Sequence, residues 1–173
     1  MKPENKEAMK QKINMFRLPT YNEIPDVGLY LEQVTKYVTG FFEPIESVNI
    51  TASMISNYVK KGLIANPVKK QYYREQIADV LFIAIAKTVI SLEEIQILLE
   101  IQRKSYDCRK AYEFFVAELE LALAKLFDIE CDKETQPHEN NDDIILVRNV
   151  ITTVAHKIYL DKVFLLYMNR IDK

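Results

Sequence analysis

Glycine is scarce in this chain of 173 residues, where it occurs only at positions 28, 40 and 62. A β-sandwich needs a turn about every 8–12 residues, and glycine and proline supply most of those turns. Three glycines and six prolines are too few for such a fold. They are also too few for the glycine-rich loops that cradle phosphates in nucleotide-binding enzymes. The chain is therefore expected to be built from helices.

Apolar residues recur at helical spacing along most of the sequence. Thr51 is a good N-cap, and Gly62 is a good residue to end the helix that follows it. Ser91 and Glu94 have the spacing of a capping box, which starts another helix. The expected helices cover about residues 26–41, 51–61, 73–86, 92–103, 106–126 and 144–170. A short hairpin is expected near residues 67–73, and the predicted fold class is all-α.

Two polar segments are predicted to lack fixed structure. Residues 1–15 are polar and lysine-rich, which predicts a disordered N-terminal tail. Residues 128–143 carry seven acidic side chains and one lysine. Such a segment buries too little apolar surface to offset the entropy lost on ordering, so it is predicted to be a mobile acidic linker.

Nothing in the sequence suggests export or membrane insertion. The N-terminus lacks the apolar core of a signal peptide. The longest apolar run, Val80–Ala86, is far shorter than the roughly 20 residues of a membrane helix. Two cysteines are too few for a disulfide scaffold. These features predict a cytoplasmic protein that does not enter a membrane.

No set of residues in the sequence resembles an active site or a metal site. His138 and His156 are too far apart for a metal-binding pair, and Cys108 and Cys131 form no C-x-x-C motif. Neighbouring carboxylates at the start of the helix after Ser91 are explained by capping. We therefore predict a protein that is not an enzyme, with no metal and no cofactor.

A basic patch lies between residues 51 and 74. The polar face of the helix over residues 51–61 consists of Ser53, Ser56, Asn57, Lys60 and Lys61. From residue 60 to residue 74 the chain has five positive and no negative side chains, although its net charge is −2. Hydroxyl, amide and ammonium donors of this kind bind phosphates and base edges. An ordinary solvated helix face is the alternative interpretation.

Residues 50–64, followed by Asn66-Pro67, resemble the recognition helix of MerR-type regulators. Ser91-Leu-Glu-Glu-Ile-Gln-Ile-Leu-Leu99 resembles a later helix of the same family, and Tyr72 falls at its wing tyrosine. The chain more closely resembles a bacterial family called domain of unknown function 1836 (YkrK-like), which has a MerR-like core. The matching motifs are Leu18-Pro19, Glu23-Ile24-Pro25-Asp26, Leu29-Tyr30, Gln33-Val34, Ile50–Ile64 and Pro67–Lys70.

The sequence departs from the MerR pattern at three places. The loop over residues 42–49 is longer than a tight helix-turn-helix turn, and the wing between Leu63 and Tyr72 is short and lacks glycine. Ser56 and Asn57 stand where that family has an arginine and a tyrosine. These changes remove one strong contact to phosphate or base.

The resemblance implies a MerR-like helix-turn-helix domain over about residues 16–103. It is followed by a helical region, residues 104–173, that is expected to form a homodimer. The predicted function is a transcriptional regulator that binds double-stranded DNA. If each subunit neutralises four or five phosphates, log K for DNA binding should fall with log salt concentration at a slope of roughly −4 per subunit. The predicted DNA-binding residues are Thr51, Ser53, Ser56, Asn57, Lys60, Lys61, Lys69, Lys70, Tyr72 and Arg74. The alternative is a protein-interaction module that kept this scaffold and lost its affinity for DNA.

Overall fold

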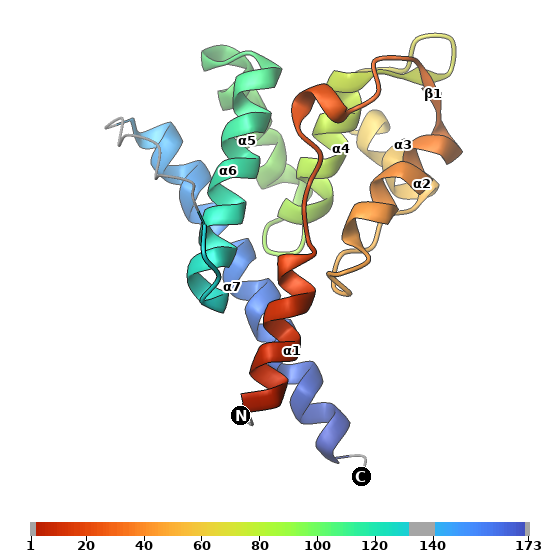
Figure 1. Cartoon of the computed structure of the whole chain (residues 1–173). Helices are drawn as coiled ribbons and strands as arrows, with labels where there is room; N and C mark the ends of the chain where they lie inside the picture. The colour runs from red at the N-terminus through yellow and green to blue at the C-terminus, as the bar shows by residue number, and fades with distance from the viewer. Residues whose placement is uncertain (1–2, 132–140, 172–173) are drawn as a thin grey trace.

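The computed structural model describes residues 3–131 and 141–171, and it shows a helical protein with one small antiparallel sheet (Figure 1). The all-α class and the short hairpin predicted from the sequence are both confirmed. The elements in chain order are α1 (Pro3–Asn14), the 3-10 turn η1 (Tyr21–Glu23), β1 (Leu29–Tyr30), α2 (Leu31–Phe42), α3 (Ala52–Lys60), β2 (Gln71–Tyr72), α4 (Arg74–Ala86), α5 (Leu92–Ser105), α6 (Cys108–Phe127) and α7 (Asp142–Ile171). No helix in the described ranges is long and apolar enough to cross a membrane.

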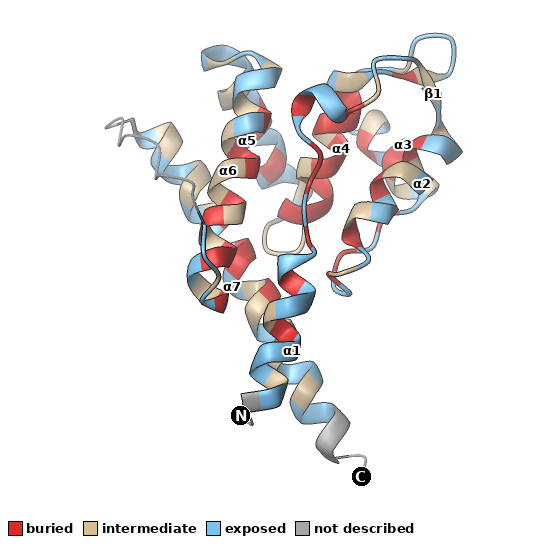
Figure 2. Ribbon diagram, in the orientation of Figure 1, coloured by how far each residue is buried: buried red, intermediate tan, exposed pale blue. Residues whose placement is uncertain are grey.

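Helix α4 forms the centre of the core. It contacts α2 on one side and α6 and α7 on the other, and it is buried along most of its length (Figure 2). Its apolar run Val80–Ala86 explains this position, because a helix that is apolar on every face must be covered from several directions. Helices α6 and α7 form the most extensive helix pair.

The caps predicted for α3 and α5 are confirmed. The Thr51 hydroxyl accepts a hydrogen bond from the Met54 amide at 3.2 Å, and α3 begins directly after this cap. Gly62 has φ of +77°, the left-handed conformation that ends many helices. At α5, the Ser91 amide donates to the Glu94 carboxylate at 2.7 Å, and the Glu94 amide donates to the Ser91 hydroxyl at 3.2 Å.

Two predictions near the N-terminus are wrong. Residues 3–14 form α1 rather than a disordered tail, because Met9 and Ile13 lie one turn apart and enter the core. Residues 26–30 are not the start of a helix. They run extended into β1, which pairs with β2 in the register Leu29 with Tyr72.

Gly28 is required where β1 meets β2. A Cβ atom at this position would lie 2.8 Å from the Gln71 side chain, so a larger residue would force the two strands apart. The pairing joins segments more than 40 residues apart, and no local pattern in the sequence indicates it. The mobile linker predicted over residues 128–143 falls largely on residues 132–140, which lie outside the described residues.

Candidate nucleic-acid interface

Helix α3 has one buried face and one exposed face. Ile55 and Tyr58 are buried, and burial raises the pKa of the Tyr58 phenol to about 12. The Lys87 ammonium fixes the start of the helix, because it donates to the Asn49 carbonyl at 2.7 Å and contacts the Met54 sulfur at 3.1 Å. These contacts hold the apolar face inward and determine which face is exposed to solvent.

The exposed face of α3 carries the polar residues predicted from the sequence. The exposed members are Thr51, Ser53, Ser56, Asn57, Lys60 and Lys61. Ser53, Ser56 and Asn57 make no side-chain hydrogen bond within the described part of the chain, so their donors and acceptors are open to a partner. Thr51 differs, because its hydroxyl oxygen is used in the helix cap.

A tight hairpin follows α3 and has two lysines at its tip. The Val68 amide donates to the Gln71 carbonyl at 3.0 Å, and the Gln71 amide donates to the Val68 carbonyl at 2.9 Å. Between them, Lys69 and Lys70 have φ of +49° and +67°. Two central residues with positive φ define a type I′ turn, which strongly favours Asn-Gly. The tip lies at the end of the molecule opposite both termini (Figure 1).

The lysines of the tip occupy a conformation that is unfavourable for them. The left-handed region costs an L-residue with a Cβ atom roughly 1–2 kcal/mol. Lys69 and Lys70 are both exposed, and no ion pair to either is found among the described residues. Backbone strain at an exposed position is a feature of many functional sites. No packing contact among the described residues explains why lysines occupy these two strained positions. What they provide there is two positive charges exposed to solvent.

Buried residues fasten the hairpin to the core. Tyr72 is only 5% exposed and packs in the core, so it is not part of the exposed surface that the sequence-based set assumed. Arg74 is also held within the protein. Its guanidinium donates to the Ile24 carbonyl at 2.8 Å, lies 3.5 Å from the Asp26 carboxylate and stacks over the Tyr21 ring.

Gln76 is a structural residue that the sequence analysis missed. Its side-chain oxygen accepts from the Tyr73 amide at 2.8 Å, which caps α4. Its side-chain nitrogen donates to the carbonyls of Ala65 and Asn66 at 2.9 and 3.1 Å, which fixes the chain leading into the hairpin. The available signal was a glutamine in the first turn of a helix whose later turns are mostly apolar, because a buried amide in such a setting needs partners.

We expect Gln76→Leu to lower the free energy of unfolding by about 2 kcal/mol, because it leaves three backbone groups without their partner. Urea denaturation followed by circular dichroism measures this change. Gln96→Leu is the matched control, since Gln96 is exposed and its side chain bonds only Glu100 among the described residues. Equal effects in the two variants would contradict the anchoring role of Gln76.

An acidic residue reduces the positive charge of the patch at one point. Glu93, in the first turn of α5, pairs with Lys61 at 2.9 Å. The hydrogen bond from Lys61 is the main reason that the pKa of Glu93 is lowered. Both side chains are exposed, and exposed pairs of this kind contribute little to stability. Three cations of the predicted set, Lys60, Lys69 and Lys70, have no acidic partner in the described ranges.

The structure gives no sign of a metal centre in the residues that it describes. No three histidine, cysteine, aspartate or glutamate side chains come together there in a way that could hold an ion.

Comparison with known families places most of this architecture in one group. The profile of the family named Domain of unknown function (DUF1836) matches residues 19–115. The chain belongs to this family. The match begins just before η1, includes α3 and the hairpin, and ends within α6. No curated protein and no solved structure matches the chain.

Proposed function

We propose that this member of the DUF1836 family is a transcriptional regulator that binds double-stranded DNA. In this proposal α3 enters the major groove, and the hairpin tip contacts phosphates beside it. The observation that carries the proposal is the combination of an exposed helix face, which has no acidic residue of its own, with two strained lysines at the tip of the following hairpin. The region α2, residues 43–51, α3 and the hairpin would then be a winged, MerR-like helix-turn-helix.

The dimensions and chemistry of α3 suit this role. An α-helix with its side chains is about 10–12 Å across, which fits the roughly 12 Å width of the major groove. Asn57 offers a donor and an acceptor together, the arrangement that pairs with the N6 and N7 atoms of adenine. Lys60 and the tip lysines would neutralise phosphates, and these contacts position the helix without reading sequence.

A second copy of the chain would double these contacts, and we propose that α7 supplies the dimer interface. Its C-terminal half exposes the apolar side chains Leu160, Phe164, Leu165, Tyr167 and Met168. Leu160, Phe164 and Tyr167 follow one another at spacings of four and three, the repeat that packs helices into coiled coils. A two-fold dimer would read a pseudo-palindrome with half-sites about one helical turn apart.

The decisive experiment is DNA binding measured by fluorescence anisotropy over a series of salt concentrations, with sites selected from a random library. Lys60, Lys69 and Lys70, which have no acidic partner among the described residues, would release about three or four counterions per protomer together with a partial contribution from Lys61. The plot of log K against log salt should therefore have a slope of about −3 per protomer. This slope is shallower than the −4 expected from sequence, because Arg74 is held within the protein. A slope near zero would favour the interaction-module alternative.

Asn57→Ala is expected to relax the preference for one base pair by about 1–3 kcal/mol and to leave binding to random DNA unchanged. The measurement is competition between the selected site and each single-base variant. Lys60→Ala is the contrasting variant, because loss of a phosphate contact should weaken all sequences alike and reduce the salt slope by about 0.9. Uniform weakening by both variants would contradict a base-reading role for Asn57.

A further inference from the structure

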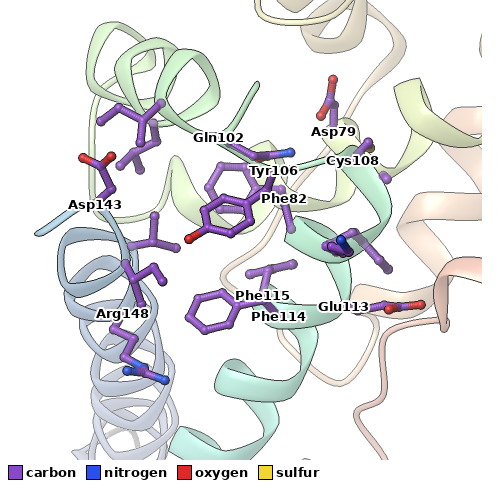
Figure 3. A pocket seen from close by; sticks show the side chains of 18 residues that line it. Asp79, Phe82, Gln102, Tyr106, Cys108, Glu113, Phe114, Phe115, Asp143 and Arg148 are labelled. Carbon is purple, nitrogen blue, oxygen red and sulfur yellow. The ribbon is translucent and has the colours of Figure 1, made fainter. Parts of the chain in front are cut away.

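A cavity of about 480 Å³ lies away from α3, between α4, α5, α6 and α7 (Figure 3). Small-molecule sites in proteins typically have volumes of about 300–1,000 Å³ and mostly apolar walls. Aromatic rings make up much of this wall, and Phe82 and Phe115 meet edge to face with ring centroids 5.2 Å apart. The rings that line it are Phe82, Tyr106, Tyr112, Phe114 and Phe115.

Most of the charged groups at the cavity are already neutralised inside the protein. Asp79 pairs with Arg103 at 3.2 Å. Arg148 pairs with Glu118 at 3.0 Å, and both side chains of this pair are largely buried. At the rim, Lys110 and Glu113 also have partners, which are Asp107 and Arg109. Asp143 is at the start of α7, where the helix dipole favours a carboxylate. The wall is therefore better suited to an uncharged occupant than to an ion.

One polar group of the wall is open to a ligand. The Gln102 side chain is partly buried, and its amide has no hydrogen-bond partner in the described part of the chain. It lines the cavity together with the rings of Tyr106 and Phe82 (Figure 3). An amide offers one acceptor and two donors, so it can pair with a neutral polar group on a ring.

Most of the sequence that connects α6 to α7 lacks large apolar side chains that would suit this cavity. Residues 132–140 read Asp-Lys-Glu-Thr-Gln-Pro-His-Glu-Asn, and none of them is a large apolar residue. Polar and charged side chains are poor fillers for an apolar space, because their desolvation is unfavourable.

We propose that this cavity binds a small, uncharged aromatic molecule, with its rings against Phe82 and Phe115 and a polar edge on Gln102. This binding site is separate from the surface proposed for DNA, and the inference holds whether or not α3 binds DNA.

The test uses the full-length protein and the neutral probe N-phenyl-1-naphthylamine, whose fluorescence increases in apolar surroundings. We expect a saturable increase with one probe per chain. Ala111→Phe and Val147→Phe fill the cavity from α6 and α7, and each should weaken binding at least tenfold. Gln102→Leu should weaken it about two- to tenfold, because the probe's N–H loses its acceptor. Circular dichroism identifies any variant that fails to fold.

The exposed apolar face of α7 is the competing place for such a probe. Phe164→Ser removes the more exposed of the two aromatic rings of that face and should leave probe binding unchanged. The proposal is overturned if the fluorescence does not saturate, or if a folded cavity-filling variant binds as tightly as the parent protein. It is also overturned if Phe164→Ser abolishes the signal.

Discussion

Replacing Lys69 and Lys70 together by alanine should reduce affinity for DNA about 10- to 100-fold at moderate salt. Each lysine is exposed at the hairpin tip and has no acidic partner in the described ranges, so each can neutralise one phosphate. Loss of two such contacts should also make the salt slope shallower by about 1.8. Because phosphate contacts carry no sequence information, the preference among DNA sites should stay the same. Anisotropy titrations at several salt concentrations measure all three quantities.

The matched control is the pair Lys6→Ala and Lys125→Ala. These lysines are exposed on α1 and α6, and their removal changes the net charge by the same amount. If both double variants weakened binding equally, the effect would come from net charge rather than from the tip. The tip variant also removes long side chains from residues with positive φ, so its folding is checked by thermal denaturation. Unchanged affinity in a folded tip variant would remove the hairpin from the proposed interface.

Glu118→Ala is expected to lower the free energy of unfolding by about 3 kcal/mol. Glu118 and Arg148 join α6 to α7 at 3.0 Å, and their side chains are only 11% and 14% exposed. The Arg148 guanidinium also lies over the Phe114 ring, which keeps it in this partly dry site. Removing one member of a buried ion pair takes that compensation away from the other charge, and this typically costs 3–5 kcal/mol. Urea denaturation at neutral pH measures the change.

Glu113→Ala provides the comparison on the same helix. Glu113 pairs with Arg109 at 2.9 Å, but both side chains are about half exposed. Helical pairs of this kind contribute about 0.3–0.5 kcal/mol. A similar loss in both variants would mean that burial does not determine the contribution of the Glu118 pair.

Local signals predicted much of the fold. Thr51, Ser91 and Gly62 mark helix ends through side-chain caps and backbone conformation, and these depend on a few neighbouring residues. The exposed face of α3 was predicted for the same reason, since helical periodicity assigns each residue to one side. The family match covers residues 19–115, a range that includes these three helix ends and α3.

Features that depend on distant contacts were not predicted. The pairing of β1 with β2 and the burial of Met9 and Ile13 join segments that no local pattern relates. The internal binding of Arg74 also requires the Ile24 carbonyl, which is 50 positions away. The cavity was missed for a related reason, because its aromatic lining has the same periodicity as an ordinary core.

The hairpin tip has a consequence for attempts to make this protein more robust. A search for thermostable variants should select glycine or asparagine at positions 69 and 70, because those residues adopt positive φ with less strain. Each such replacement would remove a cation from the surface proposed to contact phosphates. Thermostable variants recovered from that search should therefore have lower affinity for nucleic acid. Selection for heat resistance and selection for DNA binding would favour different residues at this two-residue turn.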